Sequence, residues 1–181
     1  MKKNRNPTNE ELMLRVQKGD LAAFEDLYKR LHLQLYHFIS RFVKEKPLSE
    51  DILQETFLRV LKERERYKKT ARFTTYLFTI ARNLCLDALK TGNKTHVLSS
   101  QEDPLEGAAD ISNEPSKIME SKEMNKIVRN EIQALPRSQR EVLILNKYSG
   151  LTHAEIAQIV DSTPAAVKQK IYRAMDSLKK K

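Results

Sequence analysis

The chain has 181 residues, 40% of them hydrophobic and 31% charged, and its longest apolar runs of four residues exclude a membrane-spanning segment. The net charge of +9 is divided unevenly, with +7 over residues 1–90, −4 over 91–121 and +6 over 122–181. Two basic blocks of this kind favour a polyanionic partner such as nucleic acid. The N-terminus does not read as a secretory signal and the single Cys85 cannot form an internal disulfide, so a cytoplasmic location is expected.

Two helix starts lie in the first part of the chain. Thr8 and Glu11 have the spacing of a capping box, and Gly19 can end the short helix that follows them. Asp20 then opens a long segment with apolar residues at helical spacing. Pro47 interrupts this segment, so the second helix is expected to end before it.

Two further helices are expected before residue 92. Ser49 is the predicted cap of the first, and residues 73–90 are predicted to form the second. Four amphipathic helices can bury one shared core, so residues 1–91 are predicted to be a helical domain. Residues 92–116 are rich in small polar and acidic side chains and contain two prolines, which predicts an acidic flexible linker.

Helical periodicity returns in residues 117–181, the predicted second domain, and is first broken at Pro136. Ser138 and Glu141 repeat the capping-box spacing ahead of an apolar run, and Gly150 can end that helix. The predicted fold class is therefore all-α, with two small helical domains joined by a flexible linker.

The last thirty residues predict a helix-turn-helix. Thr152 and Glu155 form another capping-box pair, and Thr163 with Pro164 can begin a second, longer helix after a tight turn. Such a helix fits the major groove, where basic and amide side chains read bases or hold phosphates. Five residues are expected to face outward on it: Lys168, Gln169, Lys170, Tyr172 and Arg173. The alternative is a plain helical hairpin with a solvated basic face.

The segment GLTHAEIAQIVDSTPAAVKQKIYRAMDSLKKK, preceded by LPRSQREVLIL, resembles the promoter-binding C-terminal domain of extracytoplasmic-function (ECF) sigma factors. The segments GDLAAFEDLYKRLHLQLYHFISRF, SEDILQETFLRVLKERERY and FTTYLFTIARNLCLDALK resemble the core-polymerase and promoter-melting domain of that family, in the expected order. The resemblance covers nearly the whole chain. It implies a sigma factor that binds core RNA polymerase and promoter DNA.

The resemblance assigns a polymerase-binding role to one stretch of the first domain. The matching residues are Asp51, Gln54, Glu55 and Phe57. Independently of the family, helical spacing places Asp51 and Glu55 on one face with Gln54 beside them, and an acidic face suits a basic protein partner. An ordinary solvated patch is the alternative.

A second stretch resembles the loop and helix that capture the separated strand at the −10 element. The implied DNA-binding residues are Arg66, Tyr67, Lys69, Arg72, Phe73, Tyr76, Arg82 and Asn83. Aromatic faces can stack on unpaired bases while cations follow the backbone. Phe73 and Tyr76 can equally be core residues, and Tyr76 stands where the family usually has tryptophan.

The resemblance also implies that Thr152 and His153 join the outward residues of the last helix at the −35 duplex. Ala165 and Ala166 replace a glycine–threonine pair common in the family, so the preferred −35 sequence cannot be transferred from relatives. As a hypothesis from this face, Lys170→Ala and Arg173→Ala should weaken promoter binding and its salt dependence.

Many ECF family members are held inactive by an anti-sigma factor, which the resemblance implies as a further partner. No cofactor, metal site or enzymatic activity is expected, because no carboxylate, histidine or cysteine cluster has ligand spacing. Two rival functions stay open: a stand-alone helix-turn-helix transcriptional regulator and a protein-binding helical adaptor.

Overall fold

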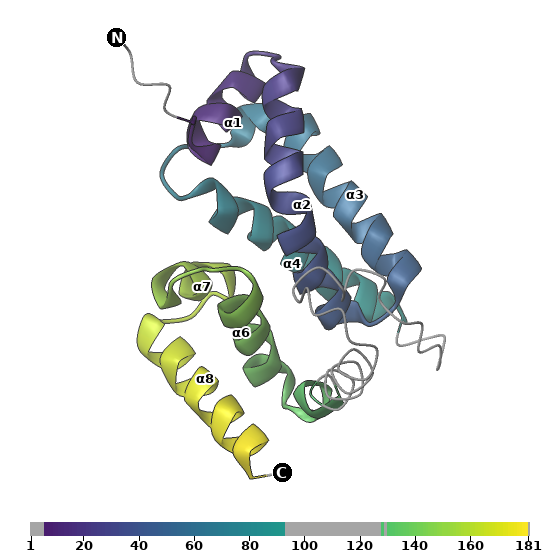
Figure 1. The fold of residues 1–181 in the computed structure, drawn as a ribbon, viewed down its shortest axis with the longest axis vertical. Coiled ribbons are helices and arrows are strands. Elements are labelled where there is room, and N and C mark those ends of the chain that lie inside the picture. The colour runs from purple at the N-terminus through teal and green to yellow at the C-terminus, as the bar shows by residue number, and fades with distance from the viewer. Residues whose placement is uncertain (1–5, 93–127, 129, 181) are drawn as a thin grey trace, which may run out of the picture.

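The computed structural model describes residues 6–92, 128 and 130–180, and this part of the chain is helical apart from short turns and connections (Figure 1). The elements are α1 (Asn9–Gln17), α2 (Leu21–Val43), α3 (Lys46–Lys62), the 3-10 turn η1 (Arg64–Arg66), α4 (Phe73–Gly92), α6 (Arg137–Tyr148), α7 (His153–Ile159) and α8 (Pro164–Lys179). The predicted all-α class with two helical domains is confirmed. The predicted linker 92–116 lies outside the described residues except for Gly92, the last residue of α4.

The first two helices begin as the sequence predicts. The Thr8 hydroxyl accepts a hydrogen bond from the Glu11 amide at 3.2 Å, and the Thr8 amide donates to the Glu11 carboxylate at 2.8 Å. Gly19 follows α1 with a φ of +87°, a conformation that suits glycine. The Asp20 carboxylate then accepts from the Ala23 amide at 3.1 Å and so caps α2.

Helix α3 begins four residues earlier than predicted, which corrects the assignment of Ser49 as its cap. Pro47 lies in the first turn of α3, where its missing amide hydrogen has no intrahelical acceptor to lose. Ser49 is buried inside the helix, and its hydroxyl donates to the Glu45 carbonyl at 2.7 Å. The proline therefore starts a helix here instead of only ending one.

The core of the first domain is built around α2, which packs against α1, α3, α4 and, from the second domain, α6. Phe38 on α2 is fully buried and meets Phe78 of α4 edge to face, with ring centroids 5.4 Å apart. Apolar residues line the same side of α2 over its whole length, so one 23-residue helix organises the domain.

Helix α6 lacks the predicted capping box. Pro136 occupies its cap position with no side-chain hydrogen bond, and Ser138 is exposed. Glu141 does not reach back to the start of α6 but pairs with Arg82 of α4, so the predicted Ser138–Glu141 box is wrong. A long-range ion pair replaces the local interaction that the spacing predicts.

The helix-turn-helix is present as predicted. The Thr152–Glu155 capping box begins α7, and the Thr163 hydroxyl accepts from the Ala166 amide at 3.2 Å to cap α8. Between them, Asp161 adopts a φ of +49°, which turns the chain tightly. Ile156, Ala157 and Val167 are buried where α7 and α8 meet, whereas Val160 and Ile171 are partly buried. The short Ala157 side chain allows the two helices to approach closely.

The two domains lie against one another. Helix α6 packs on α2, and α7 packs on α4, while α8 lies on the side away from the first domain (Figure 1). Five consecutive residues of α6, 141–145, are buried, because one side of the helix contacts α8 and the other contacts α2. Within the described ranges, no helix has both the length and the apolar character needed to cross a bilayer.

Candidate nucleic-acid interface

Helix α8 presents four of its five predicted DNA-contacting residues to solvent: Lys168, Gln169, Tyr172 and Arg173. Tyr172 is the most open of the exposed large apolar residues, at 73% exposure. Lys170 is only half-buried because its position on the helix lies at the edge of this face. In the described part of the chain, neither Lys168 nor Arg173 is held in an ion pair, so both charges are available to a ligand.

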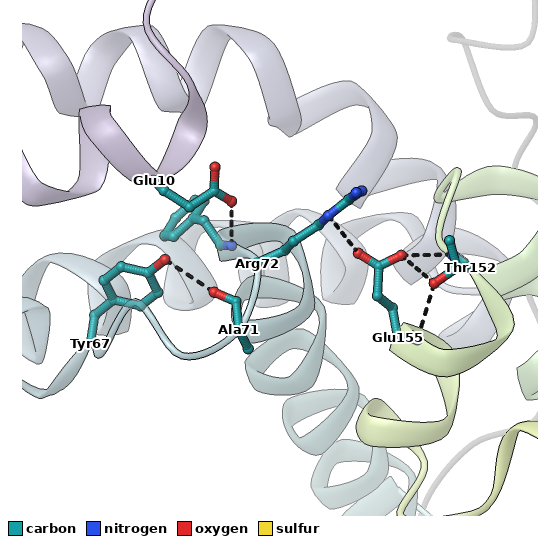
Figure 2. A network of polar contacts seen from close by, with 7 residues as sticks. Glu10, Tyr67, Ala71, Arg72, Thr152 and Glu155 are labelled. Carbon is teal, nitrogen blue, oxygen red and sulfur yellow. Dashed lines mark hydrogen bonds and ion pairs between the residues drawn. The ribbon is translucent and has the colours of Figure 1, made fainter.

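The other two predicted −35 residues lie at the start of α7. His153 is exposed, and among the described residues no hydrogen bond, ion pair or ring contact is recorded for its side chain. The Thr152 backbone is capped by Glu155, with the amide donating to the carboxylate at 2.8 Å, and the Thr152 hydroxyl lies 2.6 Å from the same oxygen (Figure 2). Thr152 therefore positions the helix, and its hydroxyl is already engaged.

Two of the three aromatic residues assigned to −10 DNA are buried. Tyr67 is 4% exposed and Phe73 is 0% exposed, and their rings meet edge to face at 5.7 Å. Neither has a free ring face on which a base could stack, so in this structure both act as core residues. Tyr76, which contacts both rings, is half-buried and is the aromatic residue of the three with surface to offer.

The start of α4 is fixed by a residue that the sequence did not single out. The Glu10 carboxylate, on α1, accepts a hydrogen bond from the Phe73 amide at 2.9 Å (Figure 2). Burial, and then the nearby Glu10 charge, raise the pKa of Tyr67 to about 12, and the Tyr67 hydroxyl donates to the Ala71 carbonyl at 3.3 Å. Only the folded chain brings Glu10 to this site, because the pair is 63 residues apart.

The arginine, lysine and asparagine residues of the predicted −10 surface fall into two groups. Arg66, Lys69 and Asn83 are exposed, with Arg66 held by Glu63 at 3.1 Å on the surface. Arg72 and Arg82 instead contact the second domain. The Arg72 Nε atom lies 3.2 Å from the Glu155 Oε1 atom (Figure 2), and Arg82 pairs with Glu141.

Glu155 carries two tasks at this contact. Burial alone would raise the pKa of its carboxyl, but hydrogen bonds from Thr152 and the charge of Arg72 outweigh burial and leave the pKa below its ordinary value. The same side chain therefore caps α7 and holds an arginine of the first domain. The capping spacing predicts the first task, whereas nothing in the local sequence indicates the second.

The predicted polymerase-binding face of α3 is partly exposed. Asp51 and Gln54 are exposed, and Glu55 is half-buried with its pKa lowered by the Arg59 guanidinium, which donates to it at 2.8 Å. Phe57 is 4% exposed and packs its ring against Tyr28, with centroids 4.8 Å apart. Phe57 therefore has little surface of its own to offer a partner, and its assignment as a polymerase contact stays a prediction.

One exposed apolar residue of α3 was missed. Leu58 is 46% exposed and follows Asp51 and Gln54 at helical spacing, so it extends the same stripe. The sequence already contains the signal, because helical spacing places this leucine on the polar side of α3 and not with the apolar residues. It gives the acidic face an apolar edge.

Candidate metal or nucleophilic chemistry finds little support at these surfaces. Among the described residues, no three His, Cys, Asp or Glu side chains gather as metal ligands would. Cys85 is fully buried, and burial together with the nearby Glu141 charge raises the pKa of its thiol far above the usual range. The thiolate form of Cys85 is thus suppressed.

Comparison with known proteins identifies both halves of the chain. A family model described as Sigma-70 region 2 matches residues 27–95, and one described as Sigma-70, region 4 matches residues 125–178. The chain is 33% identical over 170 residues to the RNA polymerase sigma factor CarQ of Myxococcus xanthus, covering 92% of this chain and 93% of that protein. It is 30% identical over 181 residues to the ECF RNA polymerase sigma-E factor of Salmonella typhimurium (strain LT2), covering 96% and 94%.

A solved structure shares the fold. The sigma factor RpoE from Bartonella quintana, in complex with the anti-sigma factor NepR, superposes with a TM-score of 0.68 at 19% identity, covering 87% of this chain and 94% of that one. The matches to both sigma regions, and to relatives over nearly the whole chain, cover the four-helix domain and the helix-turn-helix together. The chain belongs to the extracytoplasmic-function family of RNA polymerase sigma factors, non-enzymatic subunits that bind core RNA polymerase and direct it to promoters.

Proposed function

We propose that this sigma factor divides its work among three surfaces on two domains, 1–91 and 117–181, joined by the linker 92–116. The exposed face of α8 binds the −35 duplex, the α4 surface binds melted −10 DNA, and the acidic face of α3 binds core polymerase. The observation that carries the proposal is the α8 face. Its lysine, glutamine, tyrosine and arginine side chains are exposed on the second helix of a helix-turn-helix, the helix that enters the major groove.

At the −10 element, the proposal assigns stacking to Tyr76 and phosphate contacts to the basic residues around it. Tyr76 keeps part of its surface open, while Tyr67 and Phe73 hold it from below. Arg66, Lys69 and Asn83 are exposed on the same region, and Arg72 and Arg82 join them when they are released from the second domain. A stacked base flanked by cations is the arrangement that single-stranded DNA favours.

On α3, the proposal assigns polymerase binding to Asp51 and Gln54, with Glu55 beside them and Phe57 supporting the helix from the core. Exposed carboxylate and amide groups at helical spacing form a face suited to a basic helical partner. Leu58 adds an apolar contact at the edge of this face, as is common at protein interfaces.

Transcription in vitro tests the three assignments together. Purified protein added to core RNA polymerase on a library of bacterial promoter fragments should give discrete transcripts that are absent without it. Asp51→Ala with Gln54→Ala should abolish transcripts and co-elution with core enzyme, whereas Arg173→Ala should leave co-elution intact and reduce transcripts. Full activity of both variants would contradict the assignments. DNA binding without any dependence on core polymerase would instead favour a stand-alone regulator.

An anti-sigma factor is proposed as a further partner, and the cytoplasm as the place of action. The support is the similarity to a sigma factor solved with its anti-sigma factor, together with the need to reach promoter DNA. A co-purifying protein that suppresses transcription in the assay above would bear out the first point. Cell fractionation that finds the protein only with membranes would contradict the second.

A further inference from the structure

The loop between η1 and α4, residues 67–73, carries part of the surface that the proposed function assigns to melted DNA. Its middle is open, since Lys68, Lys69 and Thr70 are all exposed. The Thr70 amide donates to the Lys68 carbonyl at 2.7 Å, so the chain turns tightly at this point. Buried residues lie only at the two ends of the loop. The middle of the 67–73 loop therefore has no core packing of its own to fix its shape.

The first end of the 67–73 loop is held by Gln17, the last residue of α1. The Gln17 side-chain amide donates to the Arg64 carbonyl at 2.9 Å and to the Tyr67 carbonyl at 2.8 Å. An amide nitrogen carries two hydrogen atoms, so one side chain can serve both acceptors. The partners are 47 and 50 residues away in the sequence, so only the folded chain brings them to Gln17.

The second end of the loop is held by Glu10, near the start of the same helix. The Glu10 carboxylate accepts from the Phe73 amide at 2.9 Å (Figure 2). Phe73 is the first residue of α4, and the first amides of a helix have no acceptor within their own helix. All three contacts of Glu10 and Gln17 are made to main-chain atoms, so they fix the path of the chain whatever side chains the loop carries.

The two anchors are close enough together to make the loop arch outward. At 1.5 Å per residue of helix, the Cα atoms of Glu10 and Gln17 are about 10 Å apart along α1. The chain from Tyr67 to Phe73 can span about 20 Å when it is extended. A chain held at about half of its full reach must bend away from the line between its ends. This bend presents the two lysines of the loop to solvent.

The same contacts support the aromatic residue that is proposed to stack on a base. The rings of Tyr67 and Tyr76 have centroids 5.4 Å apart, and the Tyr76 amide donates to the Arg72 carbonyl at 3.3 Å. Contacts that fix the Tyr67 carbonyl and the Phe73 amide therefore also fix the residues on which Tyr76 rests.

The packing of α1 on the domain does not depend on these two polar residues. Leu12, Met13 and Val16 are buried with at most 1% exposure, whereas Glu10 and Gln17 are half-buried. The apolar side of α1 thus holds the helix in place, and its two polar side chains are directed to the neighbouring loop.

We infer that Glu10 and Gln17 are positioning residues for promoter recognition: they hold the 67–73 loop in the shape that binds melted −10 DNA selectively, and they do not contact the DNA themselves. The inference rests on the proposed role of Lys69, Arg72 and Tyr76 at the −10 element. A ligand binds more weakly when only a fraction of the molecules has the competent shape. A loop that keeps this shape in about one-tenth of the molecules therefore binds about tenfold more weakly.

The test compares two damaging variants with three matched ones in the full chain. Gln17→Met removes both donors, and Glu10→Met removes the acceptor, each at similar side-chain volume. Glu10→Gln is the conservative variant, because its amide oxygen can still accept from the same backbone amide. Glu11→Gln removes the same charge from the next residue of α1, where glutamine still serves in the capping box. Gln158→Met adds the same apolar side chain at an exposed glutamine of α7.

Two readouts are taken on variants that circular dichroism shows to be helical. In the free full chain, the hydrogen-bonded Thr70 and Phe73 amides should exchange about tenfold faster in Gln17→Met and Glu10→Met. With core polymerase, fluorescence anisotropy compares a single strand carrying the −10 segment of a promoter found by transcription with a scrambled strand of the same composition. The preference for the promoter strand should fall about tenfold in the two damaging variants and stay at the wild-type value in the other three. A residue that only stabilises the fold would not change this ratio.

The outcomes separate the inference from the function on which it rests. Faster exchange with an unchanged preference would overturn the inference and leave the −10 assignment standing, as would unchanged exchange in both damaging variants. A wild-type protein that shows no preference at all would overturn the −10 assignment and the inference with it. If Gln17→Met does not fold, Gln17→Asn replaces it, because the shorter side chain cannot reach both carbonyls. About a two- to threefold loss of preference is then expected, and no loss would count against the inference.

Discussion

The two surfaces assigned to promoter DNA differ in how far they are free. On α8, Lys168 and Arg173 extend into solvent, with an open Tyr172 beside them. On α4 and the segment before it, Arg72 and Arg82 are held by carboxylates of the other domain. Both surfaces are basic and both are assigned to promoter DNA, but among the described residues the structure records no ion pair for the two cations on α8, whereas each of these two arginines has one.

The difference shows that a charge pattern alone does not define a binding surface. Exposed charges act on a distant polyanion and are screened by salt, whereas a partly buried charge is also held by its partner. Arg82 is 19% exposed and is of the second kind, whereas Arg72 is 70% exposed and keeps most of its guanidinium open to solvent. The second domain therefore covers the −10 surface only in part.

Glu141→Ala should have the largest effect, because it leaves the Arg82 cation without its partner at the interface. Loss of one member of a buried ion pair lowers the free energy of unfolding by about 3–5 kcal/mol. Urea unfolding followed by circular dichroism measures this directly. Glu50→Ala, at an exposed carboxylate, should stay within about 0.5 kcal/mol of wild type. A loss below about 1 kcal/mol for Glu141→Ala would mean that the pair is solvated and the comparison fails.

The second effect concerns the open surface. Lys168→Ala combined with Arg173→Ala should weaken binding of the holoenzyme to promoter duplex about 100-fold, since each base or phosphate contact contributes about 1–3 kcal/mol. The slope of log affinity against log salt should fall by about one to two for lost phosphate contacts.

Lys170→Ala serves as the internal comparison on the same helix. Because Lys170 is half-buried at the edge of the face, its substitution should cost less than that of Arg173. Filter binding at several salt concentrations separates the two. Equal losses of promoter affinity for Lys170→Ala and Arg173→Ala would show that Lys170 belongs to the DNA-binding face as fully as Arg173.

The fold follows closely from local signals in the sequence. The capping residues Thr8, Asp20, Thr152 and Thr163 all occupy the predicted positions, because a cap depends on residues within one turn. The predicted cap at Ser138 is wrong because its partner is taken by a residue far away in the sequence. Its partner in the predicted box, Glu141, finds an arginine 59 residues away, and local spacing carries no information on that competitor.

The candidate sites were only partly predictable. Exposure of the α8 residues follows from helical period, apart from Lys170 at the edge. Tyr67, Phe73 and Phe57 look like contact residues in a sequence but are buried, since an aromatic ring serves a core as well as a ligand. The tie from Glu10 to the start of α4 depends on tertiary packing alone, as do both interdomain ion pairs.

The third effect tests which aromatic residue of the −10 surface contacts the melted DNA. Tyr76→Ala should lower formation of the open promoter complex about tenfold, because stacking on one base contributes about 1–3 kcal/mol. Permanganate reactivity of unpaired thymines measures strand opening. Tyr76→Trp should retain or increase it. Equal strand opening by Tyr76→Ala and wild type would remove Tyr76 from the site.

The smallest effect concerns pH and the more exposed of the two interdomain ion pairs, Arg72–Glu155. The pKa of Glu155 is lower in the folded protein than its ordinary value of 4.5, so its contribution to stability is present above pH 4.5 and is lost as the pH falls through the folded pKa. Arg72→Ala removes one cause of that shift, and because its side chain is 70% exposed the stability cost should be below about 1 kcal/mol.

Thermal unfolding at pH 7 and at pH 3.5 measures this contribution. The difference between Arg72→Ala and wild type should be present at pH 7 and smaller at pH 3.5, because below pH 4.5 the unfolded chain takes up a proton that the folded Glu155 carboxyl resists. Lys69→Ala, at an exposed residue for which the described part of the chain records no ion pair, should show the same small change at both pH values. A difference for Arg72→Ala that does not shrink on acidification would mean that Arg72 stabilises the protein through packing and not through the charge of Glu155.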